Sequence, residues 1–233
     1  MGAAGQRQIL EELRERIRRL ERRPARRGGF LPSGRGEVDA LLPGGGFPRG
    51  ALAELSGGPA SGKTGIALSI LRAALAEGGL AAFVDGRGEL YPPAARALGI
   101  DLGRLLIVRM DGPGETRRPG APPAALAAPS PAERVRSLLW AAEALLGSGA
   151  FGAVAIDVPL RGADPSRLEG MLRRLGAAAE QGGAAGLWLG SAAPGRRLPA
   201  VVRIELGPGG RVLRAVARGT ADGSRPGGAG HAA

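Results

Sequence analysis

The sequence predicts an α/β fold in which a mostly parallel sheet is flanked by helices and carries an antiparallel hairpin at its C-terminal end. Three observations support this fold class. Between residues 51 and 190, short apolar runs alternate with segments of helical periodicity, a pattern typical of parallel strands joined by crossover helices. A glycine-rich turn follows the first apolar run directly. Two further strand-like runs flank the Pro-Gly-Gly at 208–210, which favours a hairpin at the sheet edge.

The core elements follow from hydrophobic patterning. Apolar runs predict strands at 51–56, 80–85, 104–109, 151–157 and 186–190, and hairpin strands at 200–207 and 211–219. Helical spacing predicts helices at 63–77, 132–147 and 165–180. The apolar face of the second helix is formed by Val135, Leu138, Leu139, Ala142 and Leu146.

An amphipathic helix is expected ahead of this core, in residues 6–23. Its apolar seam consists of Leu10, Leu13, Ile17 and Leu20, at a and d positions between Arg and Glu flanks. Pro24 ends the pattern. The segment is too short for an independent coiled coil, so the seam must pack on another surface. The chain's own core, a second protomer and a different protein all remain open as that surface.

The predicted domain organisation has three parts. Residues 1–33 form the N-terminal helix and a Pro/Gly-rich linker, and 34–218 form the core. Within the core, the Pro/Ala-rich stretch 111–131 is expected to be an irregular loop. Residues 219–233 have the composition of a disordered tail.

Composition excludes several classes of protein. No run of about eighteen apolar residues is present, and the N-terminus is charged where a signal peptide is apolar, so we expect a cytoplasmic protein without a membrane partner. The chain has no cysteine, which excludes disulfides and thiolate zinc sites. Its one histidine, His231, lies in the Gly/Ala tail.

The formal net charge of +11 is concentrated at the two ends. Residues 1–35 hold ten Arg against four Glu, and residues 193–233 hold seven Arg against two acidic residues. The residues between them are balanced in charge. Basic ends indicate either a footprint for phosphate backbones or an acidic partner, or simply solubility. The sequence leaves these readings open.

The glycine-rich turn holds the one lysine of the chain, Lys63. Residues 57–64 read GGPASGKT and satisfy GxxxxGKT between a strand and a helix, as a phosphate-binding loop requires. In such a loop the backbone N–H groups and the helix N-terminus face the phosphates. The residues expected to form the nucleotide-binding loop here are Gly57, Gly58, Pro59, Ala60, Ser61, Gly62, Lys63 and Thr64. A compact ammonium fits between β- and γ-phosphates better than a planar guanidinium, which explains one lysine in an arginine-rich chain. The motif predicts ATP as the ligand, with the Thr64 hydroxyl on Mg²⁺.

A carboxylate at the end of a neighbouring strand is expected to complete the magnesium site. Asp157 closes the apolar run AVAID and is the favoured residue. Asp85 closes AAFVD and competes with it. A buried aspartate at a strand end also serves simply to cap a turn.

Together these motifs resemble the core of RecA-type recombinases. The resemblance covers about residues 31–110 and continues more weakly to about 220; its motifs are the Gly-Gly-Gly turn, PRG before the first strand, GPASGKT, FVD and LGID. Within that superfamily, VDALLPGGGFPRGALAEL is most similar to the ImuA family, also called SulA-like, of accessory proteins in bacterial error-prone translesion synthesis. The resemblance implies a RecA-like P-loop core, work in DNA damage tolerance and the SOS response, and two partners: the polymerase-like adaptor ImuB and an error-prone replicative-type DNA polymerase.

The chain departs from the recombinase pattern where that pattern supports hydrolysis. Recombinases place a glutamate two residues after the FVD aspartate, whereas this chain has Arg87 there, and Glu89 is out of register. The Asn-Gln pair that senses the γ-phosphate corresponds to Ser191 and Ala192, and Tyr91 is displaced from the place of the adenine-stacking tyrosine. We therefore expect ATP binding with slow or absent hydrolysis, with Glu89 as a weak catalytic candidate and Arg87 as an arginine finger toward a neighbouring protomer as an alternative.

Three functions remain open. The first is a nucleotide-binding scaffold that contacts DNA, single-stranded or primer-template, or the polymerase-like partner through Arg196, Arg197 and the Leu10–Leu20 seam. The second is a DNA-dependent ATPase acting as recombinase or filament mediator. The third, a small-molecule kinase, is disfavoured because the 111–131 segment offers a poor substrate lid. Oligomerisation through the N-terminal helix is compatible with the first two.

Overall fold

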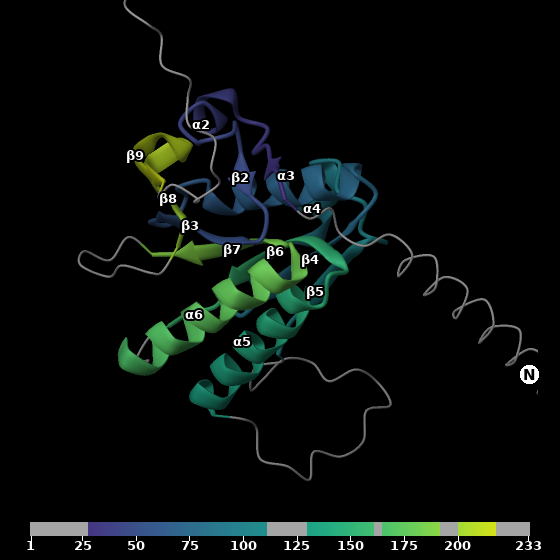
Figure 1. Ribbon diagram of the computed structural model, residues 1–233, viewed down its shortest axis with the longest axis vertical. Helices are drawn as coiled ribbons and strands as arrows, with labels where there is room; N and C mark the ends of the chain where they lie inside the picture. The colour runs from purple at the N-terminus through teal and green to yellow at the C-terminus, as the bar shows by residue number, and fades with distance from the viewer. Residues whose placement is uncertain (1–27, 111–129, 161–164, 192–199, 218–233) are drawn as a thin grey trace, which may run out of the picture.

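The computed structural model describes residues 28–110, 130–160, 165–191 and 200–217. Within these residues a seven-stranded sheet has the order β5-β4-β6-β7-β3-β8-β9 (Figure 1). Its strands are β3 (Ala51–Gly57), β4 (Leu80–Asp85), β5 (Leu105–Val108), β6 (Phe151–Asp157), β7 (Ala185–Gly190), β8 (Val202–Leu206) and β9 (Val212–Ala217). All neighbouring strands pair in parallel except β8 and β9, which form an antiparallel hairpin at one edge.

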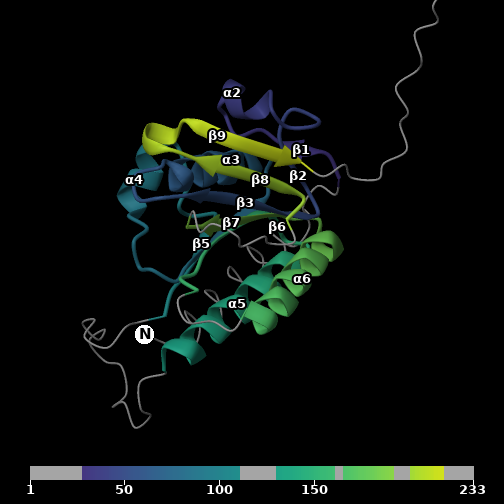
Figure 2. The same ribbon diagram turned by 90° about the vertical axis from the view of Figure 1, so that its left-hand side faces the viewer.

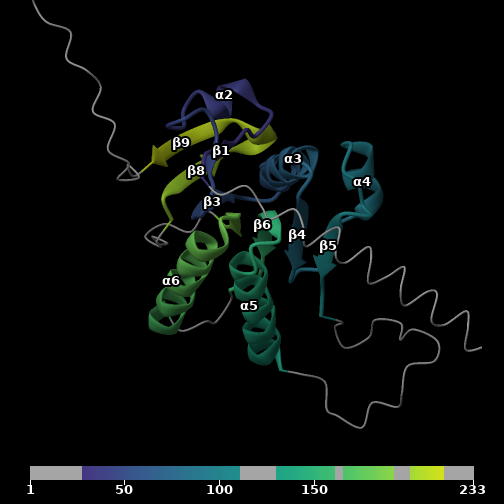
Figure 3. The same ribbon diagram turned by 45° about the vertical axis from the view of Figure 1, so that its right-hand side comes forward.

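Helices cover both faces of the sheet. Figure 2 shows α3 (Lys63–Ala76) and α4 (Pro92–Ala97) on one side and the pair α5 (Pro131–Gly147) and α6 (Pro165–Gly182) on the other. The same arrangement is visible in Figure 3, where α5 and α6 lie side by side. A short helix α2 (Gly36–Asp39) and a small antiparallel pair, β1 (Phe30–Leu31) with β2 (Phe47–Pro48), join the face of α3.

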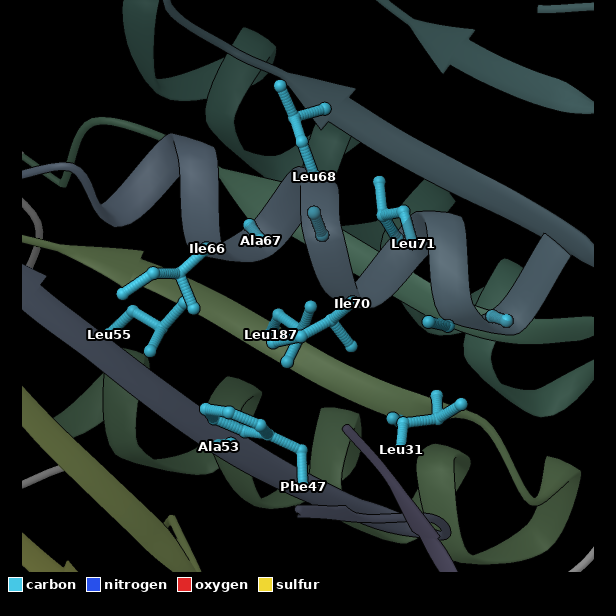
Figure 4. Close-up of a cluster of buried hydrophobic side chains, with 14 of the residues drawn as sticks. Leu31, Phe47, Ala53, Leu55, Ile66, Ala67, Leu68, Ile70, Leu71 and Leu187 are labelled. Atoms are coloured by element: carbon cyan, nitrogen blue, oxygen red, sulfur yellow. The ribbon is translucent and has the colours of Figure 1, made fainter. Parts of the chain in front are cut away.

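Alternating strand residues supply the two cores. Ala53 and Leu55 of β3 pack with Ile66 and Ile70 of α3 (Figure 4). Leu52, between them in sequence, belongs instead to the cluster beneath α5 and α6. Because side chains alternate along a strand, one strand covers both layers, and the parallel strands therefore read as continuous apolar runs.

Local chemistry sets where the helices begin. Ser130 caps α5 in a reciprocal arrangement, in which the Glu133 amide donates to Ser130 Oγ at 3.3 Å and the Ser130 amide donates to Glu133 Oε2 at 2.7 Å. Pro131 follows as the first helical residue, where its missing N–H costs nothing. The stretch expected to be irregular up to residue 131 therefore ends earlier, because a helix cap stands at 130.

The predicted α/β fold with its C-terminal hairpin is confirmed, and the strands 80–85 and 151–157 have the predicted bounds. Three small elements were not predicted: α2, α4 and the β1–β2 pair. Leu31 of β1 is fully buried in the core, although the sequence predicts a linker there, so the packed structure begins before residue 34. No helix among the described residues is long and apolar enough to span a membrane.

Candidate functional site

The phosphate-binding loop joins β3, near the middle of the sheet, to the N-terminus of α3. Its backbone curls through two positive φ angles, 57° at Ala60 and 75° at Gly62. Ala60 is the only residue other than glycine with positive φ among the described residues. Such strained backbone persists where the surroundings demand it, and it clusters at ligand sites. The loop shape is therefore that of a built anion cradle.

Glycine is required at two positions of this loop by close packing. A Cβ at Gly57 would clash with the Ser61 hydroxyl and lie 2.8 Å from the carbonyl oxygen of Leu206 in β8. A Cβ at Gly62 would lie 3.3 Å from the Cα of Gly210. The turn of the β8–β9 hairpin thus lies against the loop, a contact that the sequence pattern does not predict.

The polar groups of the loop fit a phosphate. Lys63 folds back over it, with Nζ donating to the carbonyl oxygens of Gly57 at 3.3 Å and Gly58 at 3.2 Å. The Ser61 hydroxyl is buried without a hydrogen-bond partner among the described residues. Since the first N–H groups of α3 have no acceptor within the helix, they supply further donors and a partial positive charge. These are the donors that a phosphate group would satisfy.

Asp157 ends β6 with its side chain only 7% exposed, and it is paired with Arg87. Arg87 Nε donates to Asp157 Oδ1 at 2.7 Å. Burial raises the pKa of the Asp157 carboxyl, while Arg87 and Lys63 act in the opposite direction. Because β3 and β6 run parallel in one sheet, the loop after β3 and Asp157 at the end of β6 lie at the same edge of that sheet.

Asp85 ends β4 directly beside Asp157 in the sheet register, but its partners differ. Its side chain is fully buried, and its two oxygens accept the backbone amides of Glu89 at 3.1 Å and Leu90 at 3.0 Å. Arg109 Nε donates to it at 2.7 Å. Asp85 therefore holds the loop after β4, and the turn-capping role is the one that its contacts support.

The loop after β4 is fixed at both ends. The Gly86 amide donates to the Asp157 carbonyl at 2.8 Å, and a Cβ at Gly86 would approach that oxygen to 3.0 Å. The amides bound by Asp85 fix the other end. Arg87 lies between these anchors, so the backbone itself places its side chain beside Asp157.

The other residues predicted for this site are exposed. Glu89 contributes its backbone amide to Asp85 while its side chain faces solvent, and Tyr91 is 67% exposed at the start of α4. Within the described part of the chain, no hydrogen bond or ion pair positions the side chain of the weak catalytic candidate Glu89. The structure also places Arg109 and the hairpin turn near the site, and the sequence analysis predicted neither. Their only signals in the sequence are the basic character of Arg109 and the glycines of the turn.

The predicted magnesium site fits in part. Thr64 stands half-buried on the first turn of α3, where a metal on bound phosphates would meet its hydroxyl. Arg87 occupies the Oδ1 oxygen of Asp157, so as arranged this carboxylate offers a metal at most its second oxygen. Its strand lies two positions from β3 in the sheet, with β7 between them. Among the described residues, no group of three or more His, Cys, Asp or Glu side chains forms a metal cluster.

Several predicted contact residues lie outside the described part of the chain. These are the helix residues Leu10, Leu13, Ile17 and Leu20, the loop residues Arg196 and Arg197, and Ala192.

Comparison with known proteins adds the family context. Residues 13–117 match the RecA N-terminal domain. The comparisons support a RecA-like family. Protein RecA of Salinispora tropica is 42% identical over 95 residues, which is 41% of this chain and 27% of that protein. Protein RecA of Symbiobacterium thermophilum is 43% identical over 81 residues, covering 35% of this chain and 23% of the relative.

Protein RecA of Corynebacterium jeikeium is 46% identical over 81 residues, covering 35% and 22% of the two chains. The matched region thus spans about a quarter of the length of these curated RecA relatives. The similarity to RecA includes the phosphate-binding loop and the end of β4, the two segments that form the site with Asp157.

Proposed function

We propose that this chain is an ATP-binding, RecA-like accessory or scaffold protein in DNA damage tolerance, with weak or absent ATP hydrolysis. The observation that supports this most directly is the combination of a well-formed phosphate cradle with Arg87 at the place where the recombinase pattern has a glutamate. The site has the groups to hold a triphosphate. Among the described residues, no carboxylate at the site is placed to orient water.

Binding follows from the loop. Lys63 gives up two carbonyl acceptors, which are neutral and readily replaced, for a phosphate oxygen. The Ser61 hydroxyl and the N-terminal amides of α3 supply further donors. Magnesium arriving with the nucleotide would neutralise phosphate charge, with Thr64 as its protein ligand and with Oδ1 of Asp157 available only when Arg87 leaves it.

Slow hydrolysis follows from what surrounds the cradle. Phosphoryl transfer to water depends on a group that orients the nucleophile and on stabilisation of the transition-state charge. The carboxylate of Asp85 accepts hydrogen bonds from backbone amides and Arg109, and that of Asp157 accepts one from Arg87. The Glu89 side chain is exposed, so it would need a rearranged loop to act.

The partners are proposed from the resemblance to the ImuA family and from charge. DNA, single-stranded or primer-template, is the proposed ligand of the basic ends, with Arg196 and Arg197 as contacts. The polymerase-like adaptor ImuB and an error-prone replicative-type polymerase are the proposed protein partners. The Leu10–Leu20 seam would contact one of them or a second copy of this chain.

Steady-state ATP turnover with and without single-stranded DNA tests this function, with wild type compared with Lys63→Ala. We expect wild-type turnover near the background of the variant in both conditions. DNA-stimulated turnover that is lost in Lys63→Ala would contradict the scaffold and support the alternative, a DNA-dependent ATPase acting as recombinase or filament mediator. The similarity to RecA proteins is the observation that favours this alternative.

A further inference from the structure

The unusual feature of the site is a cation supplied by the protein at the strand-end carboxylate. Arg87 approaches Asp157 through Nε at 2.7 Å; the Asp157 side chain is buried at 7% exposure, while the Arg87 side chain is 29% exposed and reaches solvent. A guanidinium carries five N–H donors. The two terminal nitrogens of Arg87 have no hydrogen-bond partner within the described residues, so they retain donors for an anion.

The position of this cation is set by the fold. The loop of Arg87 is tied to β6 through the Gly86 amide and to β4 through the amides of Glu89 and Leu90. Removing Arg87 from Asp157 would leave a buried carboxylate without its partner, which is costly. The pair is therefore expected to persist when a ligand arrives, unless that ligand supplies another cation for Asp157.

Charge at the site disfavours such a replacement. Lys63 and Arg87 bring two positive charges near Asp157, while the neighbouring Asp85 is paired with an arginine of its own, Arg109. A divalent ion at Asp157 would have either to displace the guanidinium from Oδ1 or to bind the second oxygen beside it, and in both cases it would lie close to Arg87 or Lys63. A polyanion, in contrast, gains from both cations without displacing either.

We propose that Arg87 takes the place of magnesium at Asp157, so that the site binds nucleotide phosphates with little dependence on divalent metal. Arg87 is then the residue that determines the metal requirement of the site, holding Asp157 with Nε and offering its terminal nitrogens to phosphate. The inference rests on the proposed nucleotide binding and goes beyond it by specifying the metal requirement: a nucleoside triphosphate binds about equally well with and without a divalent metal.

The test is calorimetric titration of the full chain with ATP, once in EDTA and once with excess Mg²⁺. The dissociation constant of wild type should change by less than about threefold between the two conditions, while Arg87→Ala should bind ATP at least about tenfold more tightly with Mg²⁺ than in EDTA, because Asp157 is freed. Arg87→Lys keeps a cation beside Asp157 and should behave like wild type.

Arg174→Ala is the matched control. It removes the same charge and also breaks an ion pair, that of Arg174 with Glu143 between α5 and α6, away from the loop. Its metal dependence should equal that of wild type. A wild-type protein that binds ATP about tenfold more tightly with Mg²⁺, with Arg87→Ala no different, overturns the inference but leaves nucleotide binding in place. Failure of wild type to bind ATP in either condition overturns the proposed function and this inference together.

Discussion

Arg87 and Asp157 form a short ion pair across two strand ends, with Nε of the arginine 2.7 Å from Oδ1 of the aspartate. The pair distinguishes two strand-end carboxylates that compete for one role in the sequence, where Asp157 is favoured over Asp85. Asp85 accepts hydrogen bonds from two backbone amides and from Arg109, so its role is to stabilise the fold. Asp157 is bound by one side chain that arrives from a loop, which makes it part of the site.

Asp85→Asn should destabilise the protein. The substitution removes the charge that binds Arg109 and replaces one acceptor oxygen by a donor facing a backbone amide, so we expect a loss of about 2–4 kcal/mol in the free energy of unfolding. Chemical denaturation monitored by circular dichroism measures it. Asp101→Asn is the control, since that exposed carboxylate accepts one amide from Gly103, and it should cost less than about 1 kcal/mol.

Asp157→Asn should leave the stability at pH 7 unchanged or raise it by up to about 1 kcal/mol, because a buried carboxylate is replaced by a neutral group and Arg87 can turn to solvent. Burial raises the pKa of Asp157 above its unfolded value, so the ionised group costs stability at neutral pH. That cost fades as the pH falls through the folded-state pKa toward the unfolded value of about 4.

The stability difference between Asp157→Asn and wild type should therefore shrink on acidification, and urea titrations at pH 7 and pH 4 test this. A variant that is clearly less stable than wild type at pH 7 would show that the Arg87–Asp157 pair serves the fold and not the site.

Gly57→Ala should unfold or distort the phosphate-binding loop. The added methyl group meets Ser61 and the Leu206 carbonyl, and overpacking of this kind costs about 1–3 kcal/mol. Gly58→Ala is a sharp control, because its Cβ has no neighbour within 4 Å and its φ is not positive. Thermal unfolding of the two variants should separate them by several degrees, with only Gly57→Ala losing stability and ATP affinity. Equal behaviour of the two would contradict the close packing of Gly57 against Ser61 and β8.

Much of the fold could be predicted because its signals are local. The residues of β4 and β6 form continuous apolar stretches that end at an aspartate, and the glycine-rich turn predicts the start of α3. The short β1–β2 pair and α4 were not predicted, because elements of two to six residues show too little hydrophobic periodicity.

The site was predicted less completely because its decisive contacts join distant residues. Asp157 and Lys63 could be named from their motifs. The pairing of Arg87 with Asp157 depends on β4 lying beside β6, an order that the chain does not display. The contact of Gly62 with Gly210 likewise arises only when the hairpin folds onto β3. The one available signal was an arginine two residues after a strand-end aspartate.

The central claim is that the loop around Lys63 binds a nucleoside triphosphate, and equilibrium titration of the full chain with ATP tests it most directly. Wild type should bind one ATP per chain, and Lys63→Ala should weaken binding by at least about tenfold while retaining the wild-type unfolding temperature, since Lys63 contacts only loop carbonyls among the described residues. Equal affinity of wild type and Lys63→Ala for ATP, or no binding by either protein, would contradict the account.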